Sequence, residues 1–469
     1  MVNHRPCYHF QPPANWMNDP NGPIQWRGRY HLFYQHNPQA PTEGPKHWGH
    51  AVSSDLVHWE HQPIALAPGP GQYDREGVWS GCAVDDAGVP TILYTGHPSQ
   101  SQCLATGSGD LVYWEKHAGN PVIARPPDGL QLTGFRDPFA WREEDGWRMI
   151  VGSGIQGAGG AALLYRSEDL RRWTYVQPLC VGEAEATGTM WECPNFLALS
   201  GRHVLIVSPY GKVLYFIGTY AGDRFVAEER GLLDLGDPYY ATNCLLDDRG
   251  RRVVWAWIRE ARAEGAQRAA GWSGVMSLPR ILSLDAGGRL RQEPVAELQV
   301  LRRRHWQFRG IALGADSAAA VPGVAGDSLE ILAEFELTDA GRFGLGLRCS
   351  PDDAEQTAIL YDSAARMLLA ERERSSLSPD VDRAPHGGSF DLQAGDPLRL
   401  HVFLDRSVVE AFANGQACLT TRIYPARDDS VGLRLFASGG PASVRSLDVW
   451  ELAPIWPEAT RTRSLPPPT

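Results

Sequence analysis

The chain has 469 residues, 43% of them hydrophobic and 21% charged, which is typical of a globular protein with several domains or a few large β domains. The net charge of −11 argues against a nucleic-acid partner or an anionic membrane surface and fits a neutral substrate. No apolar run reaches the length of a membrane span, and residues 1–6 lack the apolar stretch of a secretory signal.

The eight cysteines are scattered and form no CxxC pair. This pattern predicts free thiols in a reducing cytoplasm, with a mature secreted form as the alternative. The histidines show no metal-ligand spacing, so we expect neither a metal nor a cofactor. The oligomeric state is left open.

The first informative segment is Asn15–Gly22, which places Asp19 among turn-forming and amide residues. Trp16 adds a flat apolar face of the kind on which sugar rings stack. Taken alone, Asp-Pro-Asn-Gly indicates an Asx-turn in which the aspartate accepts backbone N–H bonds. Two further carboxylates at related positions in the chain favour a site instead.

The motif Asp-Leu-x-x-Trp recurs at residues 55–59, 110–114 and 169–173, with a degraded copy at residues 222–225. A period of about 55 to 59 residues is typical of a propeller blade, one four-stranded sheet per repeat. The segments between the copies are β-rich and bounded by Gly, Pro, Asp and Asn. A fifth unit fits residues 239–291, so we expect a five-bladed propeller over residues 1–300.

Four polar or aromatic residues occupy similar places near the start of successive units: Asp19, Trp79, Asp137 and Glu192. The first strand of a propeller blade lines the central channel. The repeat therefore predicts that the three carboxylates converge on the axis.

The pattern changes after residue 300. Residues 301–309 contain a basic stretch that we expect to be a solvated linker, and residues 310–456 alternate as in a β-sandwich. Asn414-Gly415 between two β-rich runs is a hairpin signal. The Pro-rich residues 457–469 are expected to be disordered.

Three acidic residues facing one pocket are suited to glycoside hydrolysis, in which one carboxylate attacks, one acid protonates the leaving oxygen and a third stabilises positive charge. Amide and backbone donors near Asp19, and Arg136 beside Asp137, favour ionised carboxylates. Glu192, between Trp191 and Cys193, has the less polar setting that raises the pKa of an acid. The structural alternatives are a local salt bridge for Arg136-Asp137 and a capped strand end for Glu192.

Three segments, residues 16–22, 135–138 and 191–194, resemble the signatures of glycoside hydrolase family 32, the family of invertases, sucrose-6-phosphate hydrolases, levanases and inulinases. Similarities also run through residues 33–35, 47–50, 79–81, 239–241, 274–280 and 405–412. The resemblance covers about 450 residues. It implies a five-bladed propeller followed by a sandwich, and retention through a covalent fructosyl-enzyme intermediate.

The resemblance also implies residue roles. Asp19 would be the nucleophile, Asp137 the transition-state stabiliser and Glu192 the acid/base. The fructose-binding residues would be Asn18, Gln35, Trp48, Trp79, Ser80 and Arg136. Asn195 departs from the acid often found there in the family, and Cys193 either acts on the acidity of Glu192 or is a plain buried thiol.

The leading hypothesis is a cytoplasmic β-fructofuranosidase acting on small sugars by exo attack. Alternatives are a fructan exo-hydrolase, a fructosyltransferase, a non-catalytic carbohydrate-binding protein and a metal-dependent hydrolase. Sucrose and sucrose 6-phosphate are not resolved by the sequence. A phosphate would need a basic group near the leaving sugar, for which Arg259, Arg262 and Lys212 are candidates.

Overall fold

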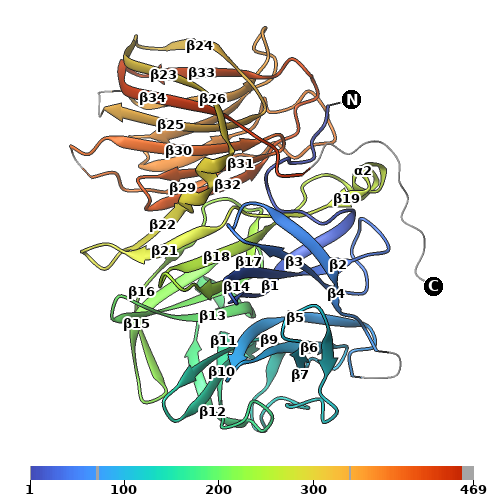
Figure 1. Ribbon diagram of the computed structural model, residues 1–469. Coiled ribbons are helices and arrows are strands. Elements are labelled where there is room, and N and C mark those ends of the chain that lie inside the picture. The colour runs from blue at the N-terminus through green and yellow to red at the C-terminus, as the bar shows by residue number, and fades with distance from the viewer. Residues whose placement is uncertain (1, 70–72, 337–339, 394, 457–469) are drawn as a thin grey trace.

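The computed structural model describes residues 2–69, 73–336, 340–393 and 395–456. Its described strands form seven sheets, five in the first part of the chain and two in the second (Figure 1). The expected disordered tail, residues 457–469, lies outside the described residues. The all-β class expected from the sequence is confirmed.

The five sheets of the first part follow one another along the chain, and each is antiparallel apart from one short added strand. In chain order the sheets are β1 (Asn15–Trp26), β2 (Arg29–Asn37), β3 (His47–Ser53) and β4 (Trp59–Leu66); β5 (Gly77–Asp86), β6 (Val89–His97), β7 (Ser101–Gly107) and β8 (Trp114–Lys116); β9 (Leu132–Glu143), β10 (Gly146–Ile155), β11 (Gly159–Ser167) and β12 (Thr174–Val181); β13 (Trp191–Leu199), β14 (Arg202–Pro209), β15 (Leu214–Ala221) and β16 (Arg224–Leu232); and β17 (Tyr239–Leu246), β18 (Arg252–Ile258), β21 (Arg280–Leu284) and β22 (Leu290–Pro294).

Short elements interrupt this order. Helix α1 (Ala184–Thr187) precedes β13, and α2 (Glu264–Ala270) follows β18. Strand β19 (Trp272–Ser273) returns to pair in parallel with β1, and β20 (Val275–Met276) pairs with β18. The first strand of each sheet contacts the first strand of the next, and β17 contacts β1, so the five first strands close a ring.

The Asp-Leu-x-x-Trp motif forms the turn between the third and fourth strands of the first three sheets. Leu56, Leu111 and Leu170 all have a left-handed φ, between 61° and 66°. The preceding aspartate stabilises each turn; Asp169 Oδ1, for example, accepts the N–H groups of Arg171 at 3.0 Å and Arg172 at 2.9 Å. The repeated motif therefore forms the same turn in each of these sheets, and the regular spacing of the motif reflects the regular spacing of these turns.

The second part is a β-sandwich whose two six-stranded sheets share one apolar core. The 3₁₀ helix η1 (Ala296–Leu301) leads into it. One sheet has the order β23 (Arg302–Leu313), β34 (Ala442–Leu452), β25 (Ser328–Glu336), β30 (Leu398–Asp405), β31 (Val408–Ala413), β32 (Ala417–Arg422), and the other β24 (Ser317–Ala325), β33 (Gly432–Ser438), β26 (Arg342–Cys349), β27 (Thr357–Asp362), β28 (Met367–Glu371), β29 (His386–Ser389).

The prediction of a linker at residues 301–309 is wrong, because residues 302–313 form the edge strand β23. Arg302 pairs with Glu330 at 2.7 Å, and its guanidinium lies 3.8 Å from the centroid of the Trp450 ring. Arg303 and Arg304 are exposed, as expected of a solvated face. Charged side chains on an edge strand discourage pairing with another chain.

The N-terminal segment joins the two parts. Asp405 of the sandwich accepts the backbone N–H groups of Cys7, Tyr8 and His9 at 2.7–2.9 Å. The His9 ring lies between Asp405 and Glu410, at 2.8 and 3.1 Å. An apolar cluster that includes residues of both parts surrounds these charges, so the interface is buried.

Candidate active site

A cavity of about 680 Å³ contains every residue expected in the site except Trp48. The three carboxylates come from the first strands β1, β9 and β13, far apart in the sequence and brought together by the ring. The expected residues that line it are Asn18, Asp19, Gln35, Trp79, Ser80, Arg136, Asp137 and Glu192.

A β-bulge in each first strand directs these side chains. The pairing register shifts at the same place in all five sheets, at residues 17–20, 79–81, 136–139, 192–195 and 240–243. Asp137 and Cys193 have left-handed φ values of 64° and 45°. A bulge bends a strand and changes the direction of its side chains. The regular hydrogen-bond pattern of each first strand is therefore interrupted next to the cavity.

Two neutral donors orient Asp19. Asn18 Nδ2 donates to Oδ1 at 2.9 Å, and Ser80 Oγ donates to Oδ2 at 2.6 Å. Trp16 Nε1 in turn donates to Asn18 Oδ1 at 2.9 Å, which fixes the amide. Burial raises the pKa of Asp19, while the bonds from Ser80 and Asn18 lower it and only partly compensate.

Asp137 is deeply buried, and its carboxylate accepts the Cys193 backbone N–H at 3.0 Å. Burial raises the pKa of Asp137 to about 7; Arg136 opposes this, whereas Glu192 and Asp19 add to it. The ionised form expected from the adjacent arginine is therefore outweighed by burial and by two like charges.

The Cys193 thiol bridges two of the carboxylates. Its sulfur lies 3.6 Å from Asp19 Oδ2 and 3.6 Å from Asp137 Oδ2. Burial raises the pKa of this thiol well above its usual value, so it stays protonated and serves as a weak donor between two acceptors. The hydrogen-bond contacts of the thiol are thus to Asp19 and Asp137, while its influence on Glu192 is electrostatic.

The setting of Glu192 is more polar than expected. Arg136 donates to Oε1 from Nε at 3.0 Å and from Nη2 at 2.8 Å, so its partner is Glu192 and not the adjacent Asp137. Tyr240 Oη contacts Oε2 and also lies 2.9 Å from the Ser208 carbonyl oxygen. A hydroxyl has one hydrogen, so a Tyr240 hydroxyl that donates to Ser208 can accept a hydrogen bond from a protonated Glu192.

Trp48 does not line the cavity, contrary to expectation. Its side chain is fully buried, and Nε1 donates to the Trp79 carbonyl oxygen at 3.0 Å. It therefore supports the strand behind the cavity. Trp79 itself stacks on His97, with ring centroids 4.0 Å apart.

The basic groups considered near a leaving sugar are outside the lining of the cavity, although Arg259 is close to it, with its guanidinium 5.2 Å from the centroid of the Tyr240 ring. In the part of the chain that the structure describes, Arg259, Arg262 and Lys212 do not line the cavity. Arg262 is paired with Glu260 at 2.6 Å. The basic side chains that do line it are Lys46, Arg75 and His97, which no motif in the sequence singled out.

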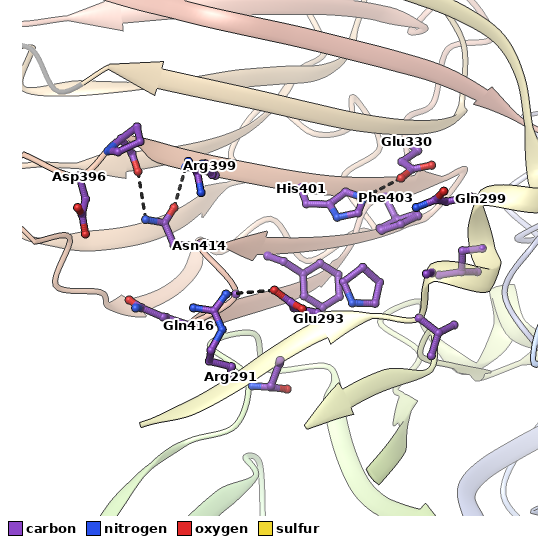
Figure 2. A pocket seen from close by; sticks show the side chains of 18 residues that line it. Arg291, Glu293, Gln299, Glu330, Asp396, Arg399, His401, Phe403, Asn414 and Gln416 are labelled. Atoms are coloured by element: carbon purple, nitrogen blue, oxygen red, sulfur yellow. Dashed lines mark hydrogen bonds and ion pairs between the residues drawn. The ribbon is translucent and has the colours of Figure 1, made fainter. Parts of the chain in front are cut away.

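A second cavity, of about 500 Å³, lies between β22, η1 and strands β30 and β31 of the sandwich (Figure 2). Two pairs of its ionisable side chains lie in contact: Arg291 with Glu293 at 3.0 Å, and His401 with Glu330 at 2.8 Å (Figure 2). It holds no cluster of carboxylates comparable to that of the first cavity among the residues described. The candidate active site is therefore the first cavity.

Within the described ranges, no group of three or more His, Cys, Asp and Glu side chains is arranged to hold a metal ion. All eight cysteines are free thiols, as predicted. No helix among the residues described is long and apolar enough to cross a membrane.

Two family models and several known proteins match this chain. The family model "Glycosyl hydrolases family 32 N-terminal domain" matches residues 9–294, and "Glycosyl hydrolases family 32 C terminal" matches residues 297–451. A sucrose-6-phosphate hydrolase of Escherichia coli is 37% identical over 95% of this chain and 94% of its own length. A raffinose invertase of Escherichia coli is 36% identical over 95% of each chain.

Solved structures are similar over nearly the whole chain. Fructan 1-exohydrolase IIa from Cichorium intybus superposes with a TM-score of 0.90 at 32% identity, covering 96% of this chain and 98% of that one. A variant of that enzyme has been solved in complex with 1-kestose. A mutant of a Bombyx mori β-fructofuranosidase, solved in complex with sucrose, has a TM-score of 0.80 at 29% identity.

Proposed function

The chain belongs to glycoside hydrolase family 32 and is a β-fructofuranosidase, and from this premise we propose that it releases terminal β-D-fructosyl units from sucrose-type substrates with retention. The observation that carries the proposal is the meeting of Asp19, Asp137 and Glu192 in one cavity. The relatives described above act, by their names, on sucrose 6-phosphate, raffinose or fructans.

We propose that the five sheets are the blades of a propeller spanning about residues 1–300, and that the sandwich begins at β23 and ends near residue 456. The closed ring of first strands supports this architecture. The free cysteines support a cytoplasmic location.

In the first step, Asp19 attacks the anomeric carbon while the glycosidic C–O bond breaks, and Glu192 gives its proton to the leaving oxygen. Asn18 and Ser80 hold Asp19 in one orientation. Asp137, close to the same carbon, would stabilise the positive charge that develops there. In the second step Glu192 takes a proton from water, which attacks the same carbon and releases Asp19.

Tyr240 and Arg136 would control the proton on Glu192. Arg136 donates to Oε1, so a proton on Glu192 would sit on Oε2, from which the Tyr240 oxygen can accept a hydrogen bond. When Glu192 is ionised, the Tyr240 hydroxyl can rotate and donate to it. The same pair of side chains can therefore serve both the acid and the base form.

Kinetics on natural and activated substrates test these roles. Asp19→Ala should abolish turnover of sucrose and of an aryl fructoside, because every substrate needs the nucleophile. Glu192→Ala should lose sucrose hydrolysis but keep part of its activity on an aryl fructoside, whose leaving group needs no proton. The exposed Asp248→Ala is the matched control. Equal losses for both variants on both substrates would contradict the assignment.

Product analysis tests the reaction itself. Sucrose, sucrose 6-phosphate, inulin and levan should each release free fructose first, in the β configuration by NMR, if attack is exo and retaining. Lengthened fructosides from concentrated sucrose would identify a fructosyltransferase, the alternative for which transfer to a sugar replaces transfer to water. Internal fragments without early fructose would contradict exo attack.

A further inference from the structure

The cavity has a buried floor and a wider, charged mouth. Asn18, Gln35, Ser80 and Asp137 of the floor are buried, whereas Glu43, Pro45, Arg75 and Glu76 at the mouth are exposed. About 680 Å³ suits a ligand larger than one sugar ring. If the fructosyl unit lies at the floor, beside the carboxylates, the leaving sugar lies in the mouth.

Lys46 is an unusually buried lysine at this mouth. It is 7% exposed and lines the cavity, with its ammonium 5.2 Å from the centroid of the Trp16 ring. Its hydrogen-bond acceptor among the described residues is Glu43, at 3.4 Å, and the Glu43 side chain is 81% exposed. Lysines are rarely this buried without a close partner, and exposed ion pairs contribute little. The ammonium therefore keeps donors available for a ligand.

Two further donors, the Arg75 guanidinium and the His97 imidazole, share a single exposed acid; burial lowers the pKa of His97, so its ring is a neutral donor at pH 7. Glu76 lies 3.2 Å from Arg75 and 3.7 Å from His97, and the Arg75 and Glu76 side chains are both about half exposed. His97 is held in place by stacking on Trp79. An anion entering the mouth can replace the weak contacts of Glu43 and Glu76 with charge-assisted hydrogen bonds.

The floor has the opposite character. Asp19, Asp137 and Glu192 meet there, with Arg136 committed to Glu192. A phosphate on the fructosyl unit would enter this cluster and be repelled. A phosphate is tolerated only on the part of the substrate that lies in the mouth.

We propose that Lys46, Arg75 and His97 recognise a phosphate monoester on the leaving sugar, so that the preferred substrate is a disaccharide phosphorylated on its glucose, as in sucrose 6-phosphate. This inference rests on the proposed function, because it takes the fructosyl position from the three carboxylates. The recognition requires no new chemical step: the same glycosidic bond breaks, and the leaving group is a sugar phosphate.

The test is the ratio of kcat/KM for sucrose 6-phosphate to kcat/KM for sucrose. The wild type should favour the phosphorylated substrate. Lys46→Met should lower this ratio about 10- to 100-fold, as expected for the loss of one hydrogen bond to a charged group. Lys46→Arg should restore much of it, and Arg75→Ala, at an exposed position, should lower it without affecting folding. Removing the competing acids, in Glu43→Gln and Glu76→Gln, should raise the ratio.

Product inhibition separates the possible sources of phosphate. Glucose 6-phosphate should inhibit more strongly than glucose or inorganic phosphate, and Lys46→Met should remove the difference between glucose 6-phosphate and glucose. The exposed Arg224→Ala on β16 is the control for loss of a positive charge. An equal loss of kcat/KM on both substrates in Lys46→Met would mean that Lys46 acts on the nucleophile Asp19 or on folding, and it would overturn the inference. Wild-type hydrolysis of sucrose with no preference for its phosphate would also overturn it while leaving the proposed function standing, whereas no fructose release from either would overturn the function.

Discussion

Replacing Asp137 by asparagine should stabilise the folded protein while removing its activity. At neutral pH and above, the native state holds an ionised Asp137 in a buried site beside Asp19 and Glu192. The rise in pKa from 3.8 to about 7 corresponds to about 4 kcal/mol at about 1.4 kcal/mol per unit. The asparagine oxygen can still accept the Cys193 N–H, so most of this cost should be recovered.

The effect has a defined dependence on pH. Below pH 4 the aspartate is protonated in both states, and the two proteins should be equally stable. Between pH 4 and 7 the unfolded chain is ionised while the native state keeps its proton, so wild-type stability falls as the pH rises. Above pH 7 the difference should level off near its maximum.

Urea unfolding at pH 4, 6 and 8 measures this difference, with the exposed Asp248→Asn as the control. The midpoint of Asp137→Asn should match the wild type at pH 4 and exceed it at pH 8, with an unchanged slope. A difference that is constant across this range, or a variant less stable at pH 8, would refute the electrostatic account of the site.

Three further changes test other contacts. Tyr240→Phe should lower kcat/KM on sucrose about tenfold, as expected for one hydrogen bond to a charged group, and much less on an aryl fructoside; an equal loss on both would exclude a role in proton transfer. Gly152→Ala should lower the free energy of unfolding by about 1–3 kcal/mol and also lower kcat, because its Cβ would collide with the Trp191 carbonyl oxygen next to Glu192. Gly265→Ala, where the space is open, should be neutral or stabilising in the same thermal unfolding experiment. His9→Gln should cost about 3–5 kcal/mol at pH 6, by urea unfolding. Burial lowers the pKa of His9, but the hydrogen bonds to Asp405 and Glu410 outweigh burial and raise the pKa above its usual value. The stability lost in His9→Gln should therefore shrink as the pH rises through this raised pKa.

Much of the first part of the fold could be predicted because its repeat is local. Asp169 and its equivalents bond to backbone groups two and three residues later, so one short motif fixes a turn wherever it occurs. The spacing of these turns then placed Asp19, Asp137 and Glu192 on equivalent strands. The Asn414-Gly415 hairpin was predicted for the same reason, and both residues have left-handed φ values.

The contacts that cross between sheets could not be predicted in this way. Lys46 reaches the site from a segment whose sequence looks like an ordinary strand end, and nothing local distinguishes it from Arg259 or Lys212. Tyr240 lies in a segment that resembles the family, but its contact with Glu192 is not visible in the sequence. Trp48 closely follows residues 43–46, which line the cavity, yet its side chain is buried and its Nε1 donates to the Trp79 carbonyl oxygen. The edge strand β23 was taken for a linker because its exposed arginines hide the alternation of the strand.

The contacts of Cys7, Tyr8 and His9 with the sandwich can form only after the sandwich has been synthesised. Tyr8 and its acceptor Asp405 are 397 residues apart, and the Cys7 and His9 carbonyl oxygens accept bonds from Ile455 and Trp456. At about 5–20 residues per second, a ribosome needs about 20–80 seconds to make the chain between Tyr8 and Asp405. Residues 7–9 are thus made long before their partners in the sandwich. A chain cut after β22 would leave His9 and Arg280 with no sandwich carboxylate to pair with, so the hydrolase half should not survive as a separate product.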